Sequence, residues 1–225
     1  MTNISHNLEQ IRQQITTHAA NCGREANQIT LLAVSKTKPA SAIEEAFASG
    51  QRDFGENYAQ ELAEKAETLK SLDITWHFIG PIQSNKTRQI AEHAHWVHSI
   101  ERAKIARRLS EQRPEGMPPL KVCIQVNIDN SPTKSGVAES ELGELIAEIS
   151  ALHHLSLQGL MAIPAPENAK DAFKRLNNLA KSHKLKTLSM GMSGDWQEAI
   201  AAGSTMIRIG TAIFGERDYK VGAKA

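Results

Sequence analysis

Hydrophobic and polar positions along this chain alternate between two periods. At the start, Ile4, Leu8, Ile11 and Ile15 recur every three or four residues, which is the spacing of an amphipathic helix. Further on, short apolar runs of strand length alternate with stretches of helical periodicity. The predicted strands lie at residues 29–35, 53–58, 76–80, 96–100, 120–128, 157–163, 187–192 and 206–214. The predicted helices lie at residues 4–20, 39–50, 59–70, up to about 94, up to about 112, 139–152, 167–183 and 195–202.

Eight strands separated by helices predict parallel pairing through crossover helices, and eight such units close into a (β/α)8 barrel. We expect one domain over residues 1–225, with an extra N-terminal helix at about 3–21. An open, doubly wound sheet is the competing architecture. Pro39 and Gly50 are expected at the first position and just past the end of one helix, and residues 114–119, rich in proline, form a loop.

Composition narrows the function classes. The chain has 225 residues and a formal net charge of +1, so bulk electrostatics do not indicate a nucleic-acid binder. Its two cysteines, Cys22 and Cys123, lie far apart, which argues against a disulfide framework or a zinc site and favours the reducing cytoplasm. The N-terminus does not resemble a signal peptide, and no apolar run approaches the ~20 residues that span a bilayer.

Lys36 is the first candidate for chemistry. In a barrel, functional groups lie at the carboxyl ends of strands and in the loops that follow. Lys36 directly follows the apolar run of the first strand, which places its amine at the barrel mouth. Partial burial lowers the pKa of a lysine, as a Schiff-base amine requires. Two alternatives stay open: a lysine that extends from a strand end into water, and Lys38 as the functional amine.

The ends of the seventh and eighth strands form a second group of candidates. Barrels often bind phosphate between the loops after these two strands. Residues 189–195 combine glycines with Ser193, and Gly210 and Thr211 belong to the eighth strand and its end. Glycines let backbone N–H groups approach a phosphate closely, and the hydroxyls add donors. The structural alternative is that these residues only form turns and helix caps.

Arg208 interrupts the apolar eighth strand, and an arginine inside a barrel is costly unless it is paired. It is either a donor to a ligand ring or phosphate, or one half of a buried ion pair with Glu56 or Asp53. Asn57 lies in the end of the second strand and could contact the same ligand from the barrel mouth. His77 is interpreted as a satisfied core residue. No His-Glu-x-x-His motif or phosphate-binding P-loop motif is present, so we expect neither a metal site nor a nucleotide loop.

Four motifs in order carry a resemblance to a known family. The chain resembles the PLP homeostasis proteins, also called pyridoxal phosphate-binding proteins, and through them the barrel domain of alanine racemase standing alone. The resemblance runs over almost the whole chain, and the four motifs together are far more specific than any one of them. They are Ala33-Val34-Ser35-Lys36, Phe54-Gly55-Glu56-Asn57-Tyr58, residues 76–86 and residues 188–215.

The resemblance implies a barrel of the alanine racemase N-terminal-domain type and the cofactor pyridoxal 5'-phosphate (PLP). Lys36 matches the lysine that forms the internal aldimine. Ser193, Gly210 and Thr211 match the phosphate-binding positions, and Arg208 matches the arginine that faces the pyridine nitrogen. Asn57 matches a contact near the cofactor. The family is associated with PLP supply and with amino- and keto-acid balance rather than with a defined turnover.

We therefore expect a monomeric, cytoplasmic PLP carrier or regulator, with PLP-requiring apo-enzymes as acceptors and no nucleic-acid or membrane partner. A small amino-acid racemase is the alternative. Racemisation needs a base on each face of the substrate, and the chain has two tyrosines, Tyr58 and Tyr219, and no expected second domain. Arg208 should also keep the pyridine nitrogen unprotonated and weaken the ring as an electron sink. A third possibility is a phosphate-binding aldolase with a substrate Schiff base on Lys36.

Overall fold

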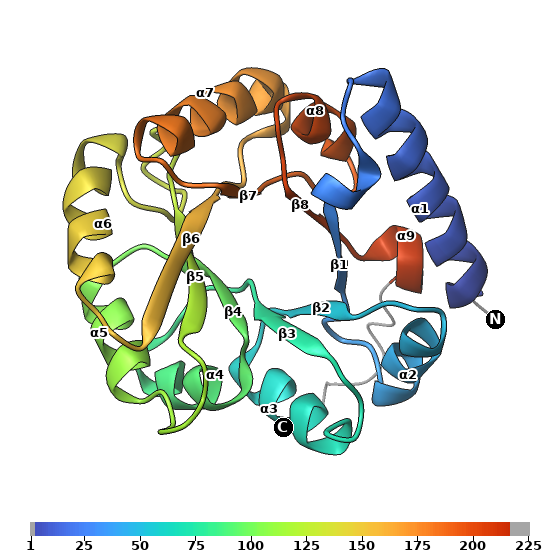
Figure 1. Cartoon of the computed structure of the whole chain (residues 1–225), viewed down its shortest axis with the longest axis horizontal. Helices are drawn as coiled ribbons and strands as arrows, with labels where there is room; N and C mark the ends of the chain where they lie inside the picture. Colours follow the sequence, from blue (N-terminus) through green and yellow to red (C-terminus); the bar gives the residue numbers. More distant parts are fainter. Residues whose placement is uncertain (1–2, 217–225) are drawn as a thin grey trace.

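The computed structural model describes residues 3–216, which form a closed barrel of eight parallel strands (Figure 1). Every strand pairs with its neighbours in chain order, and β1 pairs with β8. Because that last pairing closes the sheet, the open doubly wound alternative is excluded. The strands are β1 Thr30–Val34, β2 Asp53–Glu56, β3 Thr75–Phe78, β4 Trp96–Ile100, β5 Leu120–Gln125, β6 Leu155–Met161, β7 Thr187–Ser189 and β8 Met206–Ile209.

Helices surround the barrel and cover its outer surface (Figure 1). Most apolar residues of the strands are buried between neighbouring strands and these helices, as expected for a parallel sheet. The α-helices are α1 Ile4–Asn21, α2 Ala40–Ala48, α3 Ala59–Thr68, α4 Thr87–His93, α5 Ala103–Glu111, α6 Leu142–Ser150, α7 Ala169–Ser182, α8 Trp196–Ala201 and α9 Thr211–Phe214. Short 3-10 turns lie at Ala26–Gln28, Ser84–Lys86, Glu139–Glu141 and Pro166–Asn168.

Helix α1 precedes the first strand and packs beside α2, α8 and α9 on the outside of the barrel (Figure 1). The predicted stripe of Ile4, Leu8, Ile11 and Ile15 is its buried face. The Asn3 side chain accepts a hydrogen bond from the N–H of His6 and caps the start of the helix. The first helix, α1, and the last described helix, α9, therefore lie side by side.

Several predicted boundaries were wrong; the second strand, for example, ends at Glu56 and the seventh at Ser189. The predicted strand at 206–214 ends at Ile209 in the structure, and the remaining apolar residues form α9. Ile213 and Phe214 are buried by packing outside the strand, so their hydrophobicity extended the predicted strand too far. Pro39 is the N-cap of α2 and not its first helical residue.

The described residues limit two further possibilities. No helix among residues 3–216 is long and apolar enough to cross a membrane. Within the same residues, no group of three or more His, Cys, Asp or Glu side chains could hold a metal ion. Cys22 and Cys123 are both free thiols.

Candidate functional site

A pocket of about 200 Å³ opens at the carboxyl ends of the strands. Its apolar wall includes Val34, Ile79, Ile163, Met192 and Phe214. Ile163 and Met192 are also among the few large apolar side chains that are exposed. All six residues predicted as cofactor contacts line this pocket: Lys36, Asn57, Ser193, Arg208, Gly210 and Thr211. Their convergence follows from the barrel, which brings the ends of β1, β2, β7 and β8 to one mouth.

Lys36 lies two residues beyond β1 and is flanked by two anchored residues. Before it, the Ser35 hydroxyl donates to Glu56 Oε1 at 2.6 Å, and the Ser35 carbonyl accepts from Lys65 Nζ at 2.8 Å. After it, Thr37 adopts φ 65°, an uncommon conformation for a β-branched residue. The Thr37 N–H donates to Glu61 Oε1 at 2.6 Å and holds this turn in place. The half-buried Lys36 side chain is thereby directed into the pocket.

The anchors of Lys36 belong to a buried cluster of charges behind β1 and β2. Lys65 of α3 donates to Glu56 at 2.8 Å and to Glu61 at 2.6 Å. Burial raises the pKa of Glu56 to about 7, although the ammonium of Lys65 acts to lower it. Oε2 of Glu56 is buried and has no hydrogen-bond partner, so no hydrogen bond offsets the free-energy cost of burying this oxygen. Glu56 therefore titrates near neutral pH in the folded chain.

Arg208 is buried in β8, and its guanidinium lies inside the barrel. Nη1 donates to the carbonyl and the hydroxyl of Ser189 at 2.7 and 2.8 Å, and Nη2 donates to the Ala162 carbonyl at 3.2 Å. Burial lowers its pKa to about 10, so it stays a cation at neutral pH. The buried ion pair considered for Arg208 was wrong, because Glu56 binds Lys65 and Asp53 binds His77.

The loop between β7 and α8 forms a compact turn on one side of the pocket. Gly191 adopts φ 96°, and an added Cβ would lie 2.6 Å from Cβ of Ala199. Asp195 closes the turn, since its Oδ1 accepts from the Met192 N–H at 2.6 Å and its N–H donates to the Met192 carbonyl. Ser193 lies at the exposed tip of this turn and lines the pocket.

Gly210 and Thr211 directly follow β8 and line the same pocket as Ser193. A Cβ on Gly210 would lie 3.2 Å from the carbonyl oxygen of Val34, so the close packing of β8 on β1 favours glycine there. Thr211 begins α9, where the first N–H groups of a helix lack acceptors within the helix. The hydroxyls of Ser193 and Thr211, with these N–H groups, suit an oxyanion such as a phosphate.

Asn57 follows β2 and lines the pocket next to Lys36. Its Oδ1 is buried and has no hydrogen-bond partner. A buried acceptor without a donor costs free energy, and a bound ligand that supplies a donor would remove that cost. A neighbouring hollow of about 310 Å³ shares Asn57 and is lined by the exposed Tyr58. The other tyrosine, Tyr219, lies outside the described residues.

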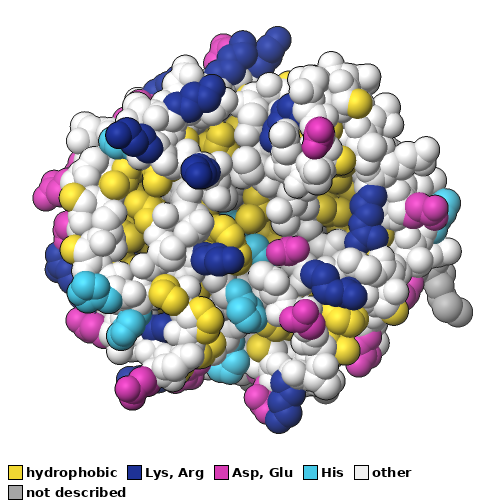
Figure 2. All heavy atoms as spheres, in the orientation of Figure 1, with side chains coloured by type: hydrophobic (Ala, Val, Ile, Leu, Met, Phe, Trp, Pro, Cys, Tyr) yellow, Lys and Arg dark blue, Asp and Glu magenta, His cyan; other side chains and the backbone are white. Residues whose placement is uncertain are grey.

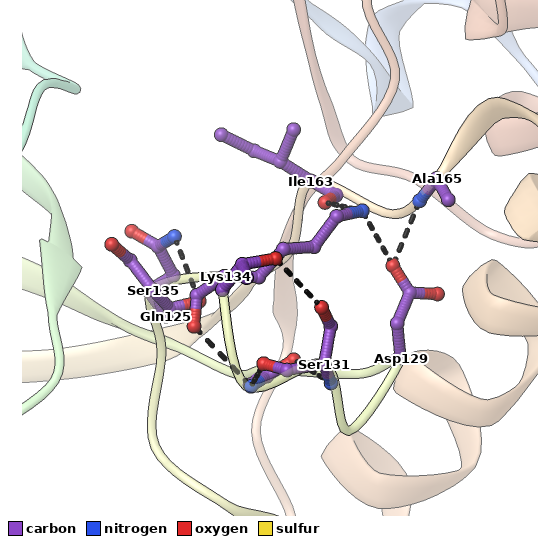
Figure 3. A network of polar contacts seen from close by, with 9 residues as sticks. Gln125, Asp129, Ser131, Lys134, Ser135, Ile163 and Ala165 are labelled. Carbon is purple, nitrogen blue, oxygen red and sulfur yellow. Dashed lines mark hydrogen bonds and ion pairs between the residues drawn. The ribbon is translucent and has the colours of Figure 1, made fainter.

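Polar contacts link the loop after β5 to the backbone of Ile163, a residue of the pocket wall (Figure 3). Lys134 Nζ donates to Asp129 Oδ2 at 2.6 Å and to the Ile163 carbonyl at 3.2 Å, and the Ala165 N–H donates to the same Asp129 oxygen at 2.8 Å. Burial acts to raise the pKa of Asp129, but these hydrogen bonds outweigh it and lower the pKa. This network ties the loop after β5 to the loop after β6, which carries Ile163. The sequence patterns did not predict this network.

Among the histidines, the interpretation of His77 as a satisfied core residue was confirmed. It is fully buried, and its ring nitrogens lie 3.0 Å from Asp53 Oδ1 and 2.9 Å from His98 Nε2. Lys38, the competing amine, also lines the pocket, but its Nζ donates to the Glu216 carbonyl at 2.6 Å. Basic and acidic side chains are intermixed on the face drawn in Figure 2, with apolar atoms between them.

The closed barrel, with a lysine, a buried arginine and two hydroxyl-bearing turns at one mouth, is of the alanine racemase N-terminal-domain class, and the model of that domain family matches residues 1–218. The pyridoxal phosphate homeostasis protein of Escherichia coli K12 is 53% identical over 231 residues, covering 97% of this chain and 99% of the relative. That of Pseudomonas aeruginosa PAO1 is 54% identical over 225 residues, covering 97% and 98%. This chain belongs to the family of pyridoxal phosphate homeostasis proteins.

Solved structures agree with this assignment. PipY of Synechococcus elongatus, determined with PLP bound, superposes with a TM-score of 0.83 at 36% identity, covering 94% of this chain and all of PipY. The alanine racemase of Corynebacterium glutamicum superposes with a TM-score of 0.69 at 19% identity, covering 96% of this chain and 60% of the racemase. At that identity the racemase shows the shared fold alone.

Proposed function

We propose that this chain binds PLP in the pocket at the barrel mouth, holds it as a Schiff base on Lys36 and acts in PLP homeostasis without a turnover of its own. The convergence of Lys36, Asn57, Ser193, Arg208, Gly210 and Thr211 on one pocket carries the proposal. The naming of the relatives and the PLP-bound PipY structure support it.

The pocket residues fit PLP at each of its polar groups. The aldehyde that PLP supplies condenses with a primary amine, and Lys36 presents one. Ser193, Gly210 and Thr211 would hold the phosphate with hydroxyl and backbone donors. Arg208 would face the ring nitrogen as a cation that donates hydrogen bonds but accepts none. The unpartnered Oδ1 of Asn57 leaves an acceptor for a ligand donor.

The ionisable side chains at the pocket favour a carrier over a racemase. Among the described lining residues these are Lys36, Lys38 and Arg208. Racemisation requires a second base across from Lys36, but Arg208 stays protonated and Lys38 is bonded to a backbone carbonyl. Tyr58 lines the neighbouring hollow instead, with an exposed side chain. We therefore propose that PLP held here passes to PLP-requiring apo-enzymes and thereby influences amino- and keto-acid balance.

Borohydride reduction followed by peptide mass spectrometry tests the Schiff base. Reduction should fix a pyridoxyl-phosphate adduct on the peptide that carries Lys36, and Lys36→Ala should abolish the adduct and the near-visible absorbance. Lys38→Ala is the matched control, since it removes an amine from the same pocket and should keep both. An adduct on Lys38, or no absorbance gained on adding PLP, would contradict the proposal.

Racemase assays test the carrier assignment separately. The purified, PLP-loaded protein should give no robust interconversion of common L- and D-amino acids. Turnover that disappears in Lys36→Ala would establish the racemase alternative instead.

A further inference from the structure

A line of hydrogen-bonded side chains crosses the barrel interior from its amino end to the pocket. It begins at Asp53, the first residue of β2, whose Oδ1 lies 3.0 Å from His77 Nε2. His77 Nδ1 lies 2.9 Å from His98 Nε2, and His98 Nδ1 lies 2.7 Å from the Ser189 hydroxyl. That hydroxyl accepts from Arg208 Nη1 at 2.8 Å, and Arg208 lines the pocket. We call these five residues the barrel relay.

The Asp53 end of the barrel relay determines the direction of every hydrogen bond within it. An ionised carboxylate only accepts, so His77 donates to Asp53 from Nε2 and, as a neutral ring, accepts at Nδ1. His98 must then donate from Nε2 to His77 and accept at Nδ1. The Ser189 hydroxyl therefore donates its proton to His98, while its oxygen accepts from Arg208. With both rings neutral, one arrangement of protons satisfies all four contacts.

The surroundings of His77 and His98 favour uncharged imidazole rings. Burial lowers the pKa of His77 and lowers that of His98 well below the usual value, and His77 and Arg208 repel a charge on His98. The groups that face these rings are Asp53 on β2, Trp96 on β4, Lys121 on β5 and the relay members on β7 and β8. Asp53 alone among the charged ones favours a proton on His77, and burial outweighs it.

The position of the barrel relay is unusual for this fold. Barrel interiors are typically filled by Val, Ile and Leu, which need no partners. Here His77, His98, Ser189 and Arg208 are all buried, although polar groups in such a core are costly unless every one is bonded. Sites of polar burial of this kind impose a defined geometry, because a single missing partner leaves the next group unsatisfied.

We infer that Asp53, His77, His98 and Ser189 are positioning residues, which orient the guanidinium of Arg208 from the opposite end of the barrel and thereby set the affinity of the pocket for its ligand. Identifying that ligand as PLP rests on the proposed function. The direction of the hydrogen bonds in the barrel relay does not rest on the proposed function, because it is a property of the ligand-free chain.

The first test uses Asp53→Ala and 15N-labelled histidines in the ligand-free protein. In the unsubstituted chain at pH 7, the nitrogen chemical shifts should show both His77 and His98 neutral with the proton on Nε2. Without Asp53, no carboxylate acceptor holds the proton of His77 on Nε2. The tautomer with the proton on Nδ1 should then become populated at His98 as well as at His77, although Asp53 does not bond to His98.

The second test measures PLP affinity by equilibrium dialysis with Ser189→Ala. This variant removes the hydroxyl link but keeps the Ser189 carbonyl as an acceptor for Arg208. The dissociation constant should rise about three- to tenfold, as for loss of one hydrogen bond that orients a charged donor. The Nδ1 resonance of His98 should shift to the value of an unbonded acceptor.

Ser204→Ala is the matched control for both tests. Ser204 is equally buried, and its hydroxyl bonds to the carbonyls of Leu188, Met190 and Met206, outside the barrel relay. It should lower stability but leave the histidine tautomers unchanged and PLP affinity within about twofold.

Several results would overturn the inference. One is a charged ring or an Nδ1 proton on either histidine of the unsubstituted chain at pH 7. Another is unchanged PLP affinity in Ser189→Ala. A third is an unchanged His98 tautomer in a folded Asp53→Ala protein, and if that variant does not fold, the Ser189→Ala affinity decides alone. A chain that binds no PLP would refute the proposed function, and the direction of the relay would then be decided by the histidine resonances alone.

Discussion

Glu56 is the buried carboxyl group next to the Lys36 turn, and the substitution Glu56→Gln should change how stability depends on pH. Burial raises the pKa of Glu56 from 4.5 to about 7. Between these values the folded chain keeps a proton that the unfolded chain releases. Glu56 therefore contributes stability at low pH that is lost as the pH rises toward 7, which is opposite to an ordinary paired carboxylate.

The magnitude follows from the two pKa values. At about 1.4 kcal/mol per pKa unit, the gap between 4.5 and about 7 corresponds to about 3 kcal/mol when Glu56 is fully ionised. About 2–3 kcal/mol of this should be lost between pH 5 and 8. Glutamine keeps an acceptor for Ser35 and Lys65 but does not titrate. Where Glu56 is ionised, the variant also loses the ion pair with Lys65, which then retains Glu61 as its sole carboxylate partner among the described residues.

Urea denaturation followed by circular dichroism across pH 5–8 measures both profiles. The unfolding free energy of Glu56→Gln minus that of the unsubstituted chain should become more positive as pH rises, by about 2–3 kcal/mol over this range. Glu67→Gln is the control, because Glu67 lies on α3, the helix that carries Lys65, and is exposed in its pair with Lys70. Parallel profiles, or a difference that falls with rising pH, would refute the assignment of a raised pKa.

Three further predictions concern packing and thiol chemistry. Gly159→Ala should prevent correct folding or cost several kcal/mol in a thermal melt, because its Cβ would lie 1.8 Å from the backbone oxygen of Thr187; a near-normal Tm would contradict the register of β6 and β7. Leu8→Ala should lower the unfolding free energy by about 2–5 kcal/mol if α1 packs on the barrel as described, and a loss below about 1 kcal/mol would show that it does not. In the native protein Cys22 should react with a thiol reagent while Cys123, buried and with its pKa raised to about 12, should react only after unfolding; equal rates would contradict this.

The predicted ends of the strands located part of the site. Lys36 was predicted directly after a strand, and Asn57 and Thr211 were predicted in the ends of strands. Parallel strands of a barrel bring these carboxyl ends to one mouth. The same reasoning could not identify the partner of Arg208, since Glu56 points to α3 and Asp53 lies at the other end of the barrel. Which face of a strand a residue occupies depends on boundaries that hydrophobicity alone did not locate.

The sequence by itself determined the alternation of eight strands with helices and the motifs of the family. Those properties are local, because they depend on spacing along one segment of chain. Only the tertiary structure decided that β1 pairs with β8, that Lys65 supports the Lys36 turn, and that His98 joins His77 to Ser189. Each of these contacts joins residues on different strands or helices, so its partner depends on how the barrel closes and which side chains face its interior.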